Sequence, residues 1–231
     1  MKKLLYTVGA AVLLAANLGA TTIAGACTAD TFANYIENYG QGLGTGCQID
    51  DKVFSEFFSS NAGAYTDVNP LNPDAFHQGF QFSGVFAALG GTNFTASLEY
   101  VVETVDAQAL IKDMALKISG ISAVPQGAHV LVNENICADA DCNVILATLS
   151  VGNGSGSLVL SDTDNWNPVN KIYVFKDITI TYDRGYTGPA VNFSEMRQIV
   201  SQVEGEVPEP GTYAMLGVGL LGLAFIRRRK A

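Results

Sequence analysis

The chain has 231 residues, of which 48% are hydrophobic, and a formal net charge of −9. Six of the 13 lysines and arginines lie at the two ends, so residues 27–206 carry seven cations against 21 carboxylates, a net charge of −14. Such a surface repels nucleic acid and anionic polymers, which excludes DNA and RNA as partners. The roughly 180 residues between the two ends are enough for one domain and rather few for two.

The N-terminal segment has the features of a secretory signal peptide. Two lysines precede an apolar run at residues 4–20, and small residues stand before Cys27. We expect signal peptidase to cut after Ala26, which removes residues 1–26; a cut after Ala20 is the alternative. A cysteine directly after the cut also occurs in lipoproteins, but the residue three before it is Ala, where lipoprotein signals favour Leu.

All four cysteines fall in the part of the chain that is predicted to be exported. Disulfides are expected in an oxidising compartment, and proximity along the chain favours Cys27 with Cys47 and Cys137 with Cys142. The other two connectivities stay open. A metal site is the weaker interpretation, because the Cys-x4-Cys spacing occurs once, without a second pair at ligand spacing.

Residues 27–204 are predicted to form an all-β domain, an antiparallel β-sandwich. A short helix or irregular arm is expected within 31–46, a β-like run at 52–58 and a turn-rich loop at 61–73. Strand signals then recur, each rich in β-branched or aromatic residues and bounded by Gly, Pro, Asn or Asp. They cover residues 79–85, 95–104, 114–120, 128–133, 144–151, 157–160 and 171–182, and 192–204 favours a strand over a helix. Short, regularly spaced strands without long helices are typical of a sandwich.

Alternation along these runs assigns one face of each strand to the core, because successive side chains of a strand point to opposite faces. The residues that we expect to be buried on this basis are Phe80, Phe82, Leu98, Tyr100, Val102, Ile172, Val174, Ile178 and Ile180.

Two acidic segments are candidates for calcium. Asp139 and Asp141 are two residues apart, as are Asp162 and Asp164, so alternate side chains of a loop could face one hard cation. Neither segment has the glycine and glutamate positions of an EF-hand loop. Acidic turn-forming residues between strands explain the same pattern. No other cofactor is expected.

Ligand binding and catalysis have few candidate residues. Trp166, among polar neighbours, could stack on a sugar ring, although a partly buried aromatic at the edge of a sandwich is the favoured explanation. His77 and His129 show no third group in the sequence that would orient them, and the run at 152–156 lacks the spacing of a nucleophile elbow. We therefore expect no enzymatic activity.

The end of the chain combines three parts in a fixed order. Residues 205–212 form a linker that is held extended by its prolines, with Val207, Pro208, Glu209 and Pro210 at its centre. Residues 213–226 carry no charge and are predicted to be a transmembrane helix; with the preceding threonine they reach about 22 Å, short of the roughly 30 Å hydrocarbon core. Residues 227–231 form a basic cytoplasmic tail that contains Arg227, Arg228, Arg229 and Lys230. The domain is therefore expected outside the inner membrane.

This arrangement resembles the PEP-CTERM sorting signal, the tail by which exosortases recognise and process their substrates. The resemblance implies transient anchoring in the inner membrane of a Gram-negative bacterium and cleavage near Pro208 to Pro210. It further implies delivery to the cell surface or the extracellular matrix, where exopolysaccharide and biofilm are the expected surroundings.

The body of the chain carries a second resemblance. Segments 46–57, 79–82, 98–100 and 176–180 are similar to a recurring pattern in a large group of PEP-CTERM proteins with a small β-rich extracellular domain. That group has no well-established shared ligand or activity, so nothing finer follows from this resemblance. The expected function is that of a non-catalytic surface or matrix protein. A carbohydrate- or calcium-binding module or adhesin is the alternative.

Overall fold

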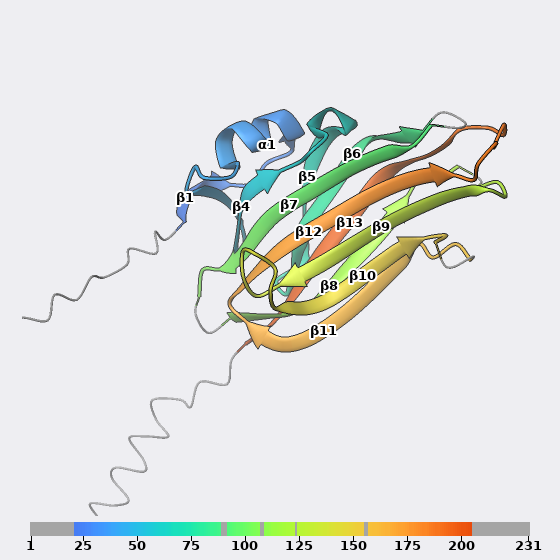
Figure 1. Ribbon diagram of the computed structural model, residues 1–231. Coiled ribbons are helices and arrows are strands. Elements are labelled where there is room, and N and C mark those ends of the chain that lie inside the picture. Colours follow the sequence, from blue (N-terminus) through green and yellow to red (C-terminus); the bar gives the residue numbers. More distant parts are fainter. Residues whose placement is uncertain (1–20, 89–91, 107–108, 123, 155–156, 205–231) are drawn as a thin grey trace, which may run out of the picture.

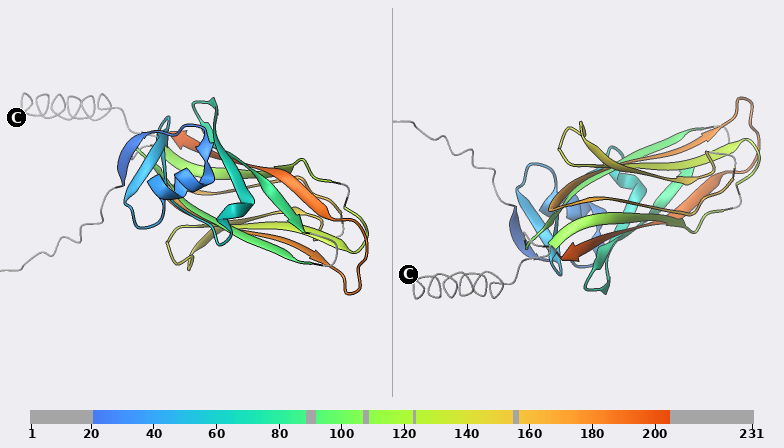
Figure 2. Two further views of the ribbon diagram at one scale, coloured as in Figure 1. Left: turned by 90° about the horizontal axis from the view of Figure 1, so that it is seen from above. Right: turned by 90° about the horizontal axis from the view of Figure 1, so that it is seen from below.

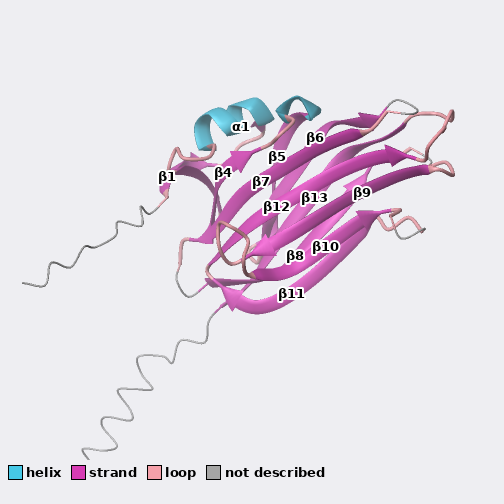
Figure 3. Ribbon diagram, viewed as in Figure 1, coloured by secondary structure: helices cyan, strands magenta, loops and turns pink. Residues whose placement is uncertain are grey.

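The computed structural model describes residues 21–88, 92–106, 109–122, 124–154 and 157–204, which form two β-sheets packed face to face with a helix at one end (Figure 1 and Figure 3). The all-β sandwich is therefore confirmed. The elements in chain order are β1 (Thr22–Ala26), β2 (Asp30–Thr31), α1 (Phe32–Tyr39), β3 (Thr45–Ile49), β4 (Lys52–Phe58), the short 3-10 helix η1 (Ala62–Ala64), β5 (Tyr65–Asp74), β6 (His77–Ala88), β7 (Phe94–Thr104), β8 (Ala109–Ser119), β9 (Ala128–Cys137), β10 (Ile145–Gly152), β11 (Ser161–Val169), β12 (Lys171–Tyr182) and β13 (Val191–Glu204).

The two sheets are visible as separate layers when the molecule is seen from above or below (Figure 2). Among the described residues, the first sheet has seven strands in the order β1-β3-β4-β7-β12-β9-β10, and the second has six in the order β11-β8-β13-β6-β5-β2. Neighbouring strands are antiparallel except β1 and β3, which are parallel. The edge strands β10 and β11 are held together across the two sheets, because Ser150 N donates to Asp162 Oδ2 at 2.8 Å.

The core lies between the layers and is formed by the inward positions of the alternating strands. All nine residues that alternation predicted to be buried are at most 2% exposed. The helix α1 closes one end of this core. Thr31 Oγ1 caps the helix by accepting from Asn34 N at 3.3 Å, and the Tyr35 ring lies 5.2 Å from that of Phe57.

The predicted loop at 61–73 is wrong, since most of it is strand β5. Its partner on one side is the long strand β6, and on the other side the two-residue strand β2 reaches only Val68 and Asp67. Beyond these residues β5 is an edge strand, where a proline leaves no hydrogen bond unmade. Pro70 and Pro73 are therefore compatible with the strand.

The predicted strand at 157–160 is also wrong, and the strand lies one segment later. Residues Leu158, Val159 and Leu160 are exposed, whereas the polar segment that follows forms β11, paired only with β8. An edge strand that is exposed on most positions needs no apolar alternation, so its sequence resembles that of a loop.

The leader and the tail fall largely outside the described residues. Residues 1–20, the linker, the predicted transmembrane helix at 213–226 and the basic tail are not described, so these predictions remain predictions. Within the described ranges, no helix has the length and hydropathy needed to cross a membrane. Thr22–Ala26 form strand β1, so the described domain begins before Cys27.

Candidate functional site

The predicted sorting motif, Val207 to Pro210, lies just beyond the last described residue. Strand β13 ends at Glu204. Two residues before its end, Gln202 is held in place because its Oε1 accepts a hydrogen bond from Lys52 Nζ. The chain therefore leaves the sandwich beside the start of β4, and only a few residues separate the folded sheet from the motif.

Two disulfides confirm the pairing that proximity favoured. Cys27 is bonded to Cys47 and Cys137 to Cys142, with Cα atoms 4.8 Å and 5.1 Å apart. The first fastens the segment after β1 to the inner strand β3, where Cys27 N also donates to Gln48 O at 2.9 Å. The second closes the loop between β9 and β10.

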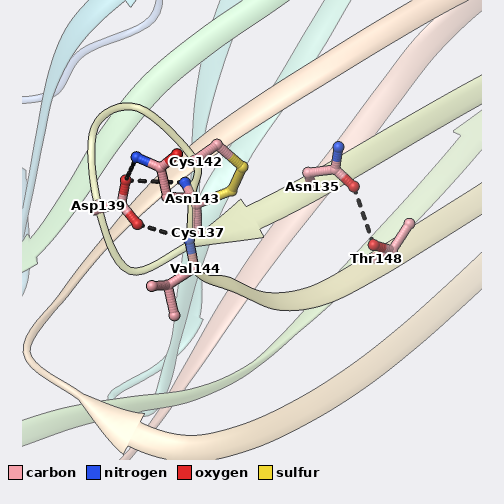
Figure 4. The surroundings of a disulfide bond; sticks show 7 residues. All are labelled: Asn135, Cys137, Asp139, Cys142, Asn143, Val144 and Thr148. Carbon is pink, nitrogen blue, oxygen red and sulfur yellow. Dashed lines mark hydrogen bonds between the residues drawn. A yellow bond between two sulfur atoms is a disulfide. The ribbon is translucent and has the colours of Figure 1, made fainter.

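Asp139 organises the loop that this second disulfide closes (Figure 4). Its Oδ1 accepts from Asn143 N at 3.0 Å and its Oδ2 from Val144 N at 2.7 Å. These hydrogen bonds lower the pKa of the Asp139 carboxyl, and the one from the backbone of Asn143 has the largest effect. The side chain therefore has the role of a turn-forming acid.

The structure does not bring the two acidic segments together. Asp139 and Asp141 precede β10, whereas Asp162 accepts from Ser150 near the other end of the same strand. Asp164 Oδ1 accepts from the neighbouring Asn165 N at 2.8 Å. Within the described residues there is no group of three or more His, Cys, Asp or Glu side chains that could hold a metal ion. The calcium hypothesis thus has no assembled ligand set to support it, and it stays a prediction.

Trp166 lies on the edge strand β11 and is partly buried against the core. Its indole Nε1 is buried without a hydrogen-bond partner in the described structure. The ring is thus less available for stacking on a sugar than its polar neighbours in sequence suggested.

Each histidine has a carboxylate beside it, which the sequence did not reveal. His77 Nδ1 lies 2.7 Å from Asp74 Oδ1, and His129 Nε2 lies 3.1 Å from Asp183 Oδ1. The hydrogen bond from the His77 side chain is the largest cause of the lowered pKa of Asp74. Both pairs are exposed on the surface, and His129 lines an open pocket of about 430 Å³ between residues 124–129 and Asn153.

A groove of about 560 Å³ crosses the second sheet and is lined by residues of β5, β8, β11 and β13. Its apolar lining includes Leu71, Ala115 and Ile199, and its two charged residues are Lys117 and Arg197, without a carboxylate among the lining residues. Lys117 and Arg197 are direct cross-strand partners in the register of β8 and β13. The positive charges of Lys117 and Arg197 repel each other in this arrangement. An anion bound between them would relieve this repulsion.

The most unusual group lies inside the sandwich. Lys176 on β12 and Glu134 on β9 are cross-strand partners, and both side chains are fully buried, with Nζ 3.1 Å from Oε2. Gln198, on β13 of the other sheet, completes the group: its Oε1 accepts from Lys176 Nζ, and its Nε2 donates to Glu134 Oε1 at 2.7 Å. Burial raises the pKa of Glu134 and lowers that of Lys176. We call these three residues the core triad.

A second buried lysine closes the end of the sandwich. Lys52 Nζ donates to Gln78 Oε1 and Gln202 Oε1 and lies 3.1 Å from Asp51 Oδ1. Burial lowers the pKa of Lys52, whereas the hydrogen bond to Asp51 and the negative charge of Asp51 act to raise it; burial has the larger effect. The side chain of Asp51 is 23% exposed, so this pair keeps contact with water, unlike the core triad.

Comparison with known proteins identifies the tail but not the domain. Residues 206–230 match the family model described as the PEP-CTERM protein-sorting motif. No curated protein matches the chain.

Among solved structures, TmCBM61 in complex with β-1,4-galactotriose is 11% identical, covers 62% of this chain and 86% of its own, and has a TM-score of 0.29. TmCBM27, a carbohydrate-binding module described for specific mannan recognition, is 8% identical, with 75% and 95% coverage and a TM-score of 0.28. A structure of infectious bursal disease virus is 13% identical, with 63% and 39% coverage and a TM-score of 0.28. Similarity this weak supports no conclusion about the present chain.

Proposed function

We propose that this chain, which carries the PEP-CTERM sorting motif, is a non-catalytic protein of the bacterial cell surface or extracellular matrix. In this proposal the leader directs export, the apolar tail holds the chain in the inner membrane, and exosortase processes it before release. The mature molecule is the acidic β-sandwich, and exopolysaccharide is its expected surroundings.

The observation that carries the proposal is the motif match at residues 206–230. The domain fits an oxidising destination, because all four cysteines are in disulfides. Strand β1 favours a leader cut after Ala20 over one after Ala26, since the later cut would remove Thr22–Ala26 from the first sheet.

The test is fractionation of wild-type cells and of a strain that lacks exosortase. The full-length chain should accumulate in the inner membrane of the mutant and reach the outside only in the wild type. Full-length protein that is distributed alike in both strains would exclude sorting by exosortase.

We also propose, as a second candidate function, that the groove on the second sheet binds an acidic polysaccharide. The observation in favour is the facing pair Lys117 and Arg197, a local pair of cations on a domain that is otherwise strongly acidic. Arg197 Nη2 also lies 3.9 Å from Glu195 Oε2, so Lys117 is the less neutralised of the two. An opening of this size is typical of ligand sites. A polyuronate would place carboxylates between the two cations and its sugar rings against the apolar lining.

The probe is sodium alginate, with uncharged dextran as the comparison. Replacing Lys117 and Arg197 together by Gln should weaken alginate binding by about tenfold or more, because charge-assisted hydrogen bonds contribute about 1.5–3 kcal/mol. The control is Lys112→Gln on the same strand, since Lys112 pairs with Asp113 at 3.9 Å and does not line the groove. Unchanged alginate binding in the double variant would exclude this site.

A further inference from the structure

The core triad places an amine, a carboxamide and a carboxylic acid in contact inside a sealed sandwich. The side chains of Lys176 and Glu134 are 0% exposed, and Gln198 is 1% exposed. The amine and the acid belong to the first sheet and the carboxamide to the second, so the contact bridges the two layers. An ion pair between Lys176 and Glu134 does not require the carboxamide of Gln198. A buried pair of charges is also rarely a net source of stability.

We propose that the core triad is a self-modification site in which Lys176 and Gln198 become joined by an isopeptide bond, with Glu134 as the catalytic acid and base. Lys176 Nζ attacks the side-chain carbonyl carbon of Gln198, whose double-bond electrons move to Oε1. The C–N bond to Nε2 then breaks, and the carbonyl forms again as a secondary amide. Of the two protons that the ammonium group of Lys176 gives up, one remains on the Glu134 carboxyl and one leaves with Nε2, as ammonia. No oxidant or external co-reactant is needed.

The positions of the groups match these roles. Lys176 Nζ contacts Gln198 Oε1, so the nucleophile lies beside the carbonyl that it attacks. Glu134 contacts both nitrogens, with Oε2 3.1 Å from Nζ and Oε1 2.7 Å from Nε2. One carboxyl group can thus take a proton from the attacking nitrogen and deliver a proton to the leaving nitrogen. Holding reactants in such contact replaces an encounter in solution with an intramolecular step.

Burial also favours the protonation states that the reaction requires. An amine attacks only when it is neutral, and desolvation lowers the pKa of Lys176. A carboxyl can deliver a proton only when it carries one, and desolvation raises the pKa of Glu134. The residues that face this pair from the packed strands include Tyr100, whose pKa is raised by burial and by the charge of Glu134.

The polar groups of the triad are better satisfied after the reaction than before it. In the described structure, the only partner of Glu134 Oε2 is the Lys176 ammonium, and the neighbouring Tyr100 Oη is buried without a hydrogen-bond partner. A charged Lys176 presents three donors to a core that offers it few acceptors. The amide product presents one N–H and one carbonyl, and removes both charges. The inference does not depend on the proposed function of the chain.

The test is peptide mapping of the full-length chain after reduction and denaturation. Trypsin should leave Lys176 uncut, because its nitrogen is acylated, and peptide 172–184 should be joined to the peptide that begins at Gln198. The joined mass should be one ammonia less than the sum of the two peptides. Recovery of peptides 172–176 and 177–184 and of the unlinked peptide that begins at Gln198 from the wild-type chain, or a link from Lys176 to Glu134 with loss of water, would overturn the proposal.

Glu134→Gln tests the assigned acid and base, because it preserves shape and removes the titratable group. We expect this variant to be cut after Lys176 and to yield the peptide that begins at Gln198 without a link, whereas the control Lys117→Met, at an exposed site, should retain the link. Both disulfides and the circular dichroism spectrum report whether the variant is folded. A folded Glu134→Gln variant that still forms the link would contradict the role of Glu134, and the wild-type map decides the link itself even if the variant does not fold.

Discussion

At the scale of single residues, Asp139 shows how one side chain fixes a loop. It accepts hydrogen bonds from two backbone N–H groups, and its pKa in the folded state is lowered. A carboxyl with a depressed folded-state pKa stabilises the fold above its unfolded-state pKa, and this contribution is lost as the pH falls through the folded-state value. The stabilisation should therefore be present at neutral pH and absent in strong acid.

Asp139→Asn should lower the melting temperature at pH 7, because the amide accepts backbone hydrogen bonds more weakly than the carboxylate. The difference from wild type should shrink as the pH is lowered below the ordinary pKa of 3.8. The measurement is thermal melting of both proteins across this pH range. The matched control is Asp141→Asn, an exposed residue of the same loop. A difference that grows in acid would contradict this role.

The core triad has a signature in the sequence. Lys176 lies between Val174 and Ile178 on β12, at an inward position of the same alternation that predicted these neighbours to be buried. Glu134 between Val132 and Ile136, and Gln198 between Met196 and Val200, occupy equivalent places on β9 and β13. Three polar residues on inward positions indicate a buried polar group, but only the pairing of the strands shows that they meet.

At the scale of the strands, the close contact of β6 and β13 depends on Gly79. An ideal Cβ at this position would lie 1.9 Å from Gln198 O, on the backbone of the neighbouring strand. The contact lies in the same stretch as Gln198 of the core triad and Ile199 of the groove. A side chain here would separate the two strands.

Gly79→Ala should destabilise the domain by about 1–3 kcal/mol, the usual cost of overpacking a rigid contact. Chemical denaturation of the purified protein measures this change in the free energy of unfolding. Gly63→Ala is the control, since its ideal Cβ meets nothing within 4 Å. Equal stability of both variants would show that β6 and β13 are free to move apart.

The bounds of β4 and β12 agree with the predicted runs at 52–58 and 171–182. Apolar alternation marks β12 along most of its length, whereas β4 is buried at its first four residues and is recognised by its content of Val and Phe. Strands β5 and β11 were missed for a different reason. Each lies wholly or partly at a sheet edge, where prolines and acidic residues are tolerated and the alternation is lost. The groove could not be predicted, because it combines four strands that are distant in the sequence.

At the scale of the whole molecule, the sandwich and the tail have separate roles. In the proposed function the tail determines where the chain is delivered, and its motif match at residues 206–230 lies outside the sandwich. The domain contains two disulfides and a buried polar group that spans both sheets. Strand β13 ends at Glu204, so processing near Pro208 to Pro210 would leave the sandwich intact.

The most direct test of the sorting account is the C-terminal peptide of the protein recovered from outside the cells. In the wild type it should end near Pro208 to Pro210 and lack residues 213–226, while a strain without exosortase should hold the intact C-terminus in its inner membrane. An extracellular protein that retains Arg227, Arg228 and Arg229 in both strains would contradict the account.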